Sequence, residues 1–199
     1  MQLKKIIEFI VFSNVWIALG AIGIALSTYF YTESEVDLLV IMLVFFSTLF
    51  GYSLQNISQR EIHNHRSNQI LWSQSNNKLI KGIVFVSFLI SVFLSFYIMN
   101  IYLIILSIPF FGLVFFYRNA FSNKLQIRNI PFFKILIISF CWSWTCCAVP
   151  QLVSNSIFNW NITFITFIYV FAITIPFDIR DMAIDKKKSI QSPSLQELE

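Results

Sequence analysis

Four long stretches of this chain contain no charged residue, and they constrain its fold more than any other feature. They are Phe9–Thr32, Leu38–Gln59, Gly82–Tyr117 and Ile135–Phe177. A transmembrane helix needs about 20 predominantly apolar residues to cross a hydrocarbon core of about 30 Å. The first two stretches match one crossing each. The third and fourth have 36 and 43 residues. Since a helix rises about 1.5 Å per residue, each of these two is predicted to double back.

The two longest stretches each contain a polar break. Met99-Asn100 divides the third stretch, and Val153–Ser156 divides the fourth. The pattern predicts an all-α integral membrane bundle of about six transmembrane helices. A barrel is not expected, because barrel strands are short, alternate in polarity and end in turn residues, whereas this chain has only five glycines. Charged residues make up 12% of the chain, against about 25% in soluble domains.

All 14 lysines and arginines fall on one side of a six-span arrangement. Two precede the first predicted span, and four lie in each of the connections after spans two, four and six. The opposite connections carry only Glu33, Glu35 and Asp37. Because basic loops stay in the cytoplasm, both termini are predicted to be cytoplasmic, in a bacterial inner (plasma) membrane. The net charge of +4 reflects this bias and does not indicate a nucleic-acid partner.

An acidic cluster at the end of the sixth predicted span is the strongest candidate for chemistry. Asp178, Asp181 and Asp185 are three and four residues apart. On a continuous helix, at about 100° per residue, their carboxylates fall within an arc of about 60°. Hard cations such as Mg²⁺ bind one or two carboxylates together with substrate phosphates, so the spacing favours a diphosphate–Mg²⁺ anchor. The alternative is a solvated helix end whose acids offset the Lys186–Lys188 run.

Asp178, Asp181, Asp185 and Lys186 resemble the second aspartate motif of UbiA-type membrane prenyltransferases. That motif ends the sixth helix as Asp-x-x-Asp-x-x-x-Asp followed by basic residues, and the match is position by position. Phe12–Leu19 is also similar to the first helix of some bacterial members. The resemblance implies a transferase that moves a prenyl group from a prenyl diphosphate to a lipophilic, often aromatic, acceptor in the membrane. It also implies Mg²⁺ on the diphosphate, between two facing aspartate motifs.

The first motif of that family is altered in this chain. The family pattern is an Asn after the second span, with Asp residues four and eight positions further on. In this chain Asn56 is followed by Arg60 and Asn64. The resemblance therefore implies that Asn56 is the remnant of the first motif. It further implies that Arg60 and Lys186 are auxiliary contacts of the substrate diphosphate.

The length of the chain also departs from the family, whose fold has nine helices. Residues 1–188 are expected to form a single UbiA-like domain that lacks the last three helices, followed by a short flexible tail at 189–199. A fragment, or a chain completed by a membrane partner protein, is consistent with this. A second hypothesis is therefore a catalytically inactive relative that binds lipid or pairs with another membrane protein. A transporter is not favoured, because no ionisable residue lies deep within a predicted span.

Two further groups of residues carry weaker signals. Glu61 and His65 lie four residues apart and would share a helix face, but two ligands are too few for a metal site. Cys141, Cys146 and Cys147 all lie within the fifth predicted span. We expect these cysteines to be small apolar helix residues and not a disulfide framework.

Overall fold

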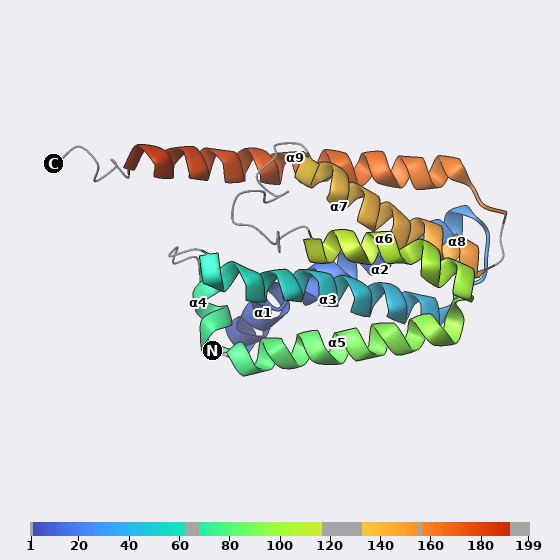
Figure 1. The fold of residues 1–199 in the computed structure, drawn as a ribbon, viewed down its shortest axis with the longest axis horizontal. Helices are drawn as coiled ribbons and strands as arrows, with labels where there is room; N and C mark the ends of the chain where they lie inside the picture. The colour runs from blue at the N-terminus through green and yellow to red at the C-terminus, as the bar shows by residue number, and fades with distance from the viewer. Residues whose placement is uncertain (1, 63–67, 117–132, 155–156, 192–199) are drawn as a thin grey trace.

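The computed structural model describes residues 2–62, 68–116, 133–154 and 157–191, whose regular structure is helical throughout, with no strand. The long helices run back and forth along one axis (Figure 1). Segments α7, η2 and α8 follow one another without a break, and η2 is a π-helix. The elements are α1 (Gln2–Phe12), α2 (Val15–Tyr31), α3 (Leu38–Ile62), α4 (Asn68–Ser75), α5 (Asn77–Ile98), α6 (Ile101–Phe116), α7 (Phe133–Ser143), η2 (Trp144–Ala148), α8 (Val149–Val153) and α9 (Trp160–Gln191).

Several of these helices are long and apolar enough to cross a membrane. Within the described ranges three qualify by length and composition, namely Asn77–Ile98, Phe133–Val153 and Trp160–Phe177. The pair α1 and α2 makes a fourth if two helices bent by 66° count as one crossing. In α3 and α6 the apolar parts whose side chains are described, Leu38–Leu54 and Ile101–Val114, are shorter. The all-α class is confirmed, and the apolar helices are consistent with a membrane protein.

Both breaks predicted inside the long apolar stretches are present. The α5–α6 connection is Met99-Asn100, and the Asn100 side chain caps α6 by accepting a hydrogen bond from the Leu103 amide at 2.8 Å. The second break follows Val153, where α8 ends, and α9 begins at Trp160. Asparagine side chains satisfy the unpaired amides of a helix start, which explains why these polar residues interrupt apolar sequence.

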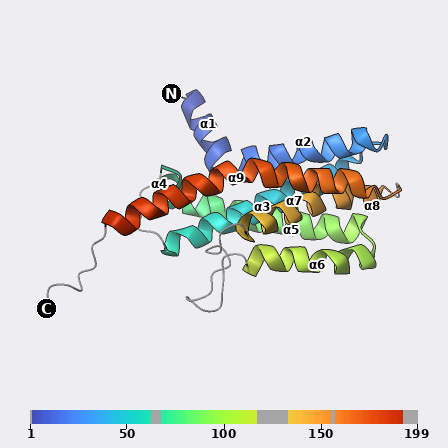
Figure 2. The same cartoon turned by 90° about the horizontal axis from the view of Figure 1, so that it is seen from above.

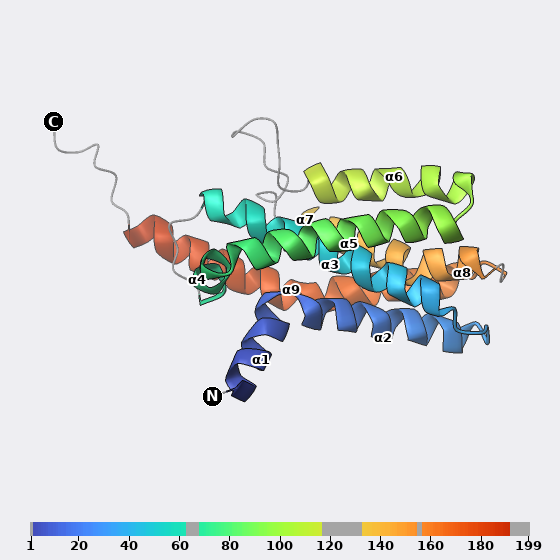
Figure 3. The same cartoon turned by 90° about the horizontal axis from the view of Figure 1, so that it is seen from below.

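The first apolar stretch differs from the expectation of one straight crossing. It is divided at Ser13-Asn14, where Asn14 has a left-handed backbone with φ of 67°. The α1 and α2 axes differ in direction by 66° as a result. Ser53 of α3 donates its Oγ to the Ser13 carbonyl oxygen at 3.3 Å, which holds the break against α3. Helix α2, whose 17 residues span about 25 Å, is the part of this stretch that runs along the bundle (Figure 3).

The two ends of the bundle differ in charge. Figure 3 shows the α2–α3, α5–α6 and α8–α9 connections together at one end, with the starts of α1 and α5 toward the other. The first end carries the acidic residues Glu33, Glu35 and Asp37, which belong to the α2–α3 connection. The other end carries lysines in the first turns of α1 and α5, which are Lys4, Lys5, Lys78 and Lys81. The described lysines of α1 and α5 and the acidic α2–α3 connection therefore lie at opposite ends of the bundle.

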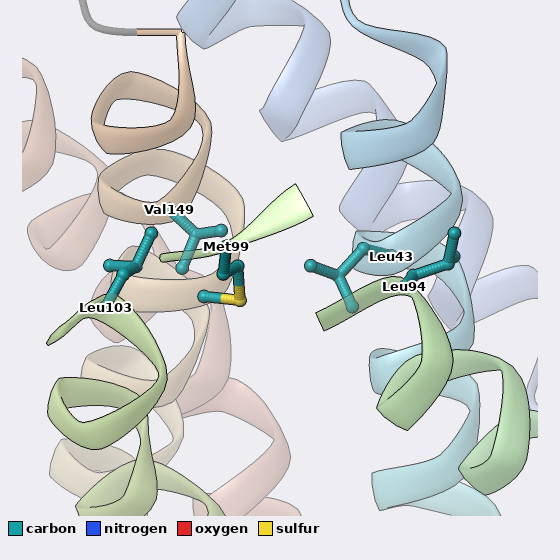
Figure 4. Packing of buried hydrophobic residues seen from close by; sticks show 5 residues of the cluster. All are labelled: Leu43, Leu94, Met99, Leu103 and Val149. Carbon is teal, nitrogen blue, oxygen red and sulfur yellow. The ribbon is translucent and has the colours of Figure 1, made fainter. Parts of the chain in front are cut away.

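The buried interior is small and sits between the helices. One cluster joins α3, α5, α6 and α8 through Leu43, Leu94, Met99, Leu103 and Val149 (Figure 4). A second cluster is built from Ala21, Ala25, Val44 and Cys146, which bring α2 close to α3 and η2. Small residues at helix contacts are typical of membrane bundles, because lipid tails remove the hydrophobic drive for association and close packing replaces it.

Candidate functional site

The acidic cluster predicted as a diphosphate anchor lies on α9. This helix continues without a break through Asp178, Asp181 and Asp185, although Pro176 lies inside it. The backbone therefore meets the condition for the three aspartates to share one helix face. Their side chains, and that of Lys186, lie outside the described residues. Helix α9 ends only at Gln191, three residues into the expected tail.

The remnant of the first motif lies on the last turns of α3. Both Asn56 and Arg60 belong to this helix, which ends at Ile62. Their side chains, like those of Glu61 and His65, lie outside the described residues. Across the residues that are described, no group of three or more His, Cys, Asp or Glu is arranged to hold a metal ion. The Mg²⁺ site thus stays a prediction that depends on the α9 aspartates.

The described residues form a cavity that the sequence analysis did not foresee. Its volume is about 110 Å³, and it lies among α3, α5, α6 and the α7–η2–α8 segment. Aromatic rings make up much of the wall, contributed by Phe50, Phe110, Phe111, Trp142 and Trp144. Ligand sites in proteins are typically apolar and aromatic with a few placed polar groups. The lining therefore suits a hydrophobic chain better than a polar ligand.

Trp144 forms one wall of this cavity from η2. Its ring stacks on Phe110 of α6, with centroids 4.5 Å apart and planes 5° apart. The indole Nε1 donates to Ser107 Oγ at 3.2 Å, and Ser107 in turn donates to the Leu103 carbonyl oxygen at 2.8 Å. Both ends of the indole are thus held against α6. The result is a stacked aromatic pair in a fixed position in the cavity wall.

Tyr52 and Trp142 join α3 to α7 at another part of the same wall. The Trp142 Nε1 donates to the Tyr52 hydroxyl oxygen at 3.0 Å, and the two rings meet edge to face with centroids 6.3 Å apart. Position 56 follows position 52 by one helical turn on α3. The polar part of the cavity wall therefore lies one turn from the remnant of the first motif.

The π-helix η2 has a physical cause in Pro150, which lies two residues after its end. Pro150 has no amide hydrogen, so it cannot donate to the carbonyl oxygen of Cys146, four residues earlier. That carbonyl oxygen accepts a hydrogen bond from Thr28 Oγ1 of α2 at 3.2 Å instead. Single π turns occur often at functional sites, and this one places Trp144 in the cavity wall. The sequence signal for this irregularity is Pro150, because a proline within an apolar span interrupts the hydrogen bonds of the helix.

Chemically, the cavity is a binding space more than a reaction centre. Its described lining offers serine and threonine hydroxyls, one phenol and two thiols, from Ser47, Thr48, Tyr52, Ser95, Ser107, Cys141, Thr145 and Cys146. No carboxylate or imidazole is among these described lining residues. Comparison of the chain with protein-family models, with curated proteins and with solved structures gives no match.

Proposed function

We propose that this protein is a UbiA-like prenyltransferase, which transfers a prenyl group from a prenyl diphosphate to a lipophilic acceptor within the membrane. The observation that carries the proposal is the unbroken course of α9 through Asp178, Asp181 and Asp185. The aromatic cavity between α3 and α7 supports it by offering space for an isoprenoid chain. Helix α7 also packs against α9, which brings the cavity wall next to the acidic helix.

The residue types fit the metal that this reaction needs. Three carboxylates on one helix are hard oxygen donors of the kind that bind Mg²⁺ together with substrate phosphates. A bound Mg²⁺ ion would neutralise the charge that collects on the diphosphate as the allylic carbon–oxygen bond breaks. In this proposal Asn56, Arg60 and Lys186 contact the phosphates directly. Arg60 then supplies positive charge where the family pattern has an aspartate and its metal ion.

The aromatic wall has a second role in this proposal. Ionisation leaves a positive charge on the prenyl group, and water would quench it. The stacked rings of Trp144 and Phe110 are held in fixed positions in the cavity wall. Aromatic faces attract cations and exclude water at the same time. The cavity would thus both hold the chain and protect the reactive end from hydrolysis.

We further propose six membrane crossings with both termini in the cytoplasm of a bacterial cell. The support is the excess of lysine and arginine at the end of the bundle opposite the α2–α3 connection. Glu35→Cys and Lys78→Cys place a thiol at opposite ends. In intact cells, a membrane-impermeant maleimide should modify position 35, and position 78 only after permeabilisation. The reverse pattern would refute the orientation. The native cysteines are buried or half-buried and set the background.

Enzymatic transfer is tested with membranes that contain the protein, a radiolabelled prenyl diphosphate and an aromatic acceptor. We expect Mg²⁺-dependent transfer that falls by about a hundredfold or more in Asp181→Asn, because the leaving diphosphate loses electrostatic stabilisation. Asp37→Asn is the matched control. Asp37 lies at the opposite end, and its Oδ1 accepts a hydrogen bond from the Leu39 amide at 2.8 Å, which an asparagine oxygen can also accept. Transfer that is equal in Asp181→Asn and wild type would rule out the assigned site.

The altered first motif favours one alternative. Arg60 and Asn64 stand where the family pattern has carboxylates, so half of the metal site is changed. The alternative is a catalytically inactive relative that binds isoprenoid lipid or a membrane partner protein. It predicts that a photoreactive prenyl analogue crosslinks to the cavity wall, for example at Phe111, with the same yield in Mg²⁺ and in chelator. Transfer activity with any acceptor would exclude it.

A further inference from the structure

Helix α1 departs from the direction of the bundle. Its axis lies at 66° to that of α2, and Figure 2 shows it projecting away from the other helices. If α2 runs close to the membrane normal, α1 lies much nearer to the plane of the membrane than to its normal. An 11-residue helix in this orientation cannot be a crossing segment.

The faces of α1 differ sharply in polarity. Leu3, Ile6 and Ile7 share one face and are exposed to 70%, 54% and 53%. At about 100° per residue, Lys5 lies about 200° from Ile7 and so on the opposite face. Lys4 is also exposed and forms a long ion pair of 3.9 Å with Glu8. An exposed ion pair of this kind is weak, so Lys4 remains available to other anions. This is the pattern of a helix that lies at a membrane surface.

The direction of α1 is held by contacts on its inner side. The rings of Phe9 and Phe12 pack on Trp72 of α4, with centroids 6.4 Å and 5.8 Å away. Ser13 and Asn14 at the bend are almost fully buried, and Ser13 is bonded to α3. The exposed apolar face is therefore presented in one direction and is not a consequence of a loose terminus.

We propose that α1 is an interfacial helix that binds anionic phospholipid in the cytoplasmic leaflet. Its apolar face lies among the upper acyl chains, and its lysines contact the headgroups. The inference rests on the proposed orientation, in which this end faces the cytoplasm. Charge supports a lipid occupant, because Lys4, Lys5, Lys78 and Lys81 occur near the starts of α1 and α5, and Glu8 is the one acidic residue of these two helices. A lysine near an anionic surface strengthens binding by about fivefold.

The location of α1 is tested by spin labels on the whole protein in phospholipid nanodiscs. Ile7→Cys and Lys5→Cys each carry a nitroxide. Phe96→Cys on α5 is the lipid-facing reference and Glu35→Cys the aqueous reference. We expect position 7 to be more accessible to oxygen than to a water-soluble nickel chelate, as at position 96, and position 5 to show the opposite, as at position 35. Equal chelate access at positions 5 and 7 would overturn the proposal.

The lipid preference is tested by mass spectrometry of the purified protein titrated with phosphatidylglycerol and phosphatidylcholine. Phosphatidylglycerol should bind preferentially, and its affinity should fall about fivefold for each lysine in the series Lys5→Gln, Lys4→Gln/Lys5→Gln. No loss in the double variant would refute the headgroup contact. Dipolar broadening between position-7 labels would show that a second copy of the chain covers this face. Neither measurement depends on prenyl transfer, and the maleimide test reports on orientation separately.

Discussion

The hydrogen bond between Tyr52 and Trp142 offers a direct measure of how firmly α3 is held to α7 at the cavity. Tyr52→Phe removes only the hydroxyl oxygen that accepts the indole hydrogen at 3.0 Å. The ring remains, so the edge-to-face contact with Trp142 is kept. Trp142→Phe removes the donor and also part of the indole ring, so this single variant changes packing as well. The double-mutant cycle cancels the packing changes that do not involve the Tyr52 hydroxyl, and leaves the interaction of that hydroxyl with Trp142.

The expected magnitude follows from where the bond lies. A donor left unpaired in a dry interior costs about 1–3 kcal/mol. Hydrogen bonds between membrane helices contribute less, about 0.6 kcal/mol on average and at most about 1.7 kcal/mol, because the unfolded helices find other partners. The Tyr52–Trp142 bond is part-buried at a cavity wall, so water or the neighbouring hydroxyls can partly replace it. We therefore expect a coupling free energy of about 0.6–1.5 kcal/mol.

The assay is reversible unfolding in mixed detergent micelles, with the denaturing detergent as the titrant and helix content as the signal. Each single variant should shift the midpoint, and the double variant should shift it by less than the sum. A coupling free energy close to zero would mean that Tyr52 and Trp142 do not hold α3 to α7, and that this pair is not part of the cavity wall. Equal coupling with a bound prenyl analogue is expected, since both groups lie in the wall and not in the space itself.

Three further variants test the same part of the fold by the same unfolding assay. Gly51→Ala places a Cβ 3.5 Å from the side chain of Val114, which is an ordinary contact. This variant should raise stability by up to about 1 kcal/mol, because alanine has the higher helix propensity. A loss of stability would show that the cavity wall has no room for the added methyl group. Gln151→Leu should cost about 1–3 kcal/mol, because the Asn159 amide donates to Gln151 Oε1 at 2.7 Å and would lose this acceptor. Thr28→Val should cost about 0.5–1.5 kcal/mol by removing the donor to the Cys146 carbonyl oxygen; no change would show that this hydrogen bond contributes little to the packing of η2 on α2.

Sequence reasoning succeeded where a local signal marks the chain. Asn100 interrupts an apolar stretch because its side chain caps the next helix, so the break could be placed to the residue. The acidic spacing of α9 required only a continuous helix, and the helix is continuous past Pro176. The number of crossings depends instead on the length of each apolar helix, and among the described residues three helices are long enough, or four if α1 and α2 count as one crossing.

The cavity could not be predicted for a different reason. Its walls come from four separate segments, and residues such as Phe110 and Trp144 meet only because α6 packs on η2. In a soluble helix the apolar face indicates which side is buried. A helix that faces lipid on one side and protein on the other is apolar all round, so its sequence does not distinguish the two. Phe96 is 69% exposed and Leu94 only 5%, although both are large apolar residues of α5.

The break between α1 and α2 is also not predictable from the apolar sequence. No proline or glycine marks it, and Ser13-Asn14 is a small polar pair in an otherwise apolar run. Within the described residues, Ser13 Oγ and Asn14 Nδ2 are buried and have no hydrogen-bond partner, which is unfavourable in a dry interior. A straight helix would let a serine hydroxyl bond to the preceding turn and would avoid the left-handed backbone. The fold keeps the bend in spite of these costs, and the bend turns the apolar face of α1 away from the bundle. That is the geometry expected if the interfacial position of α1, and not the continuity of the first crossing, is what the sequence maintains.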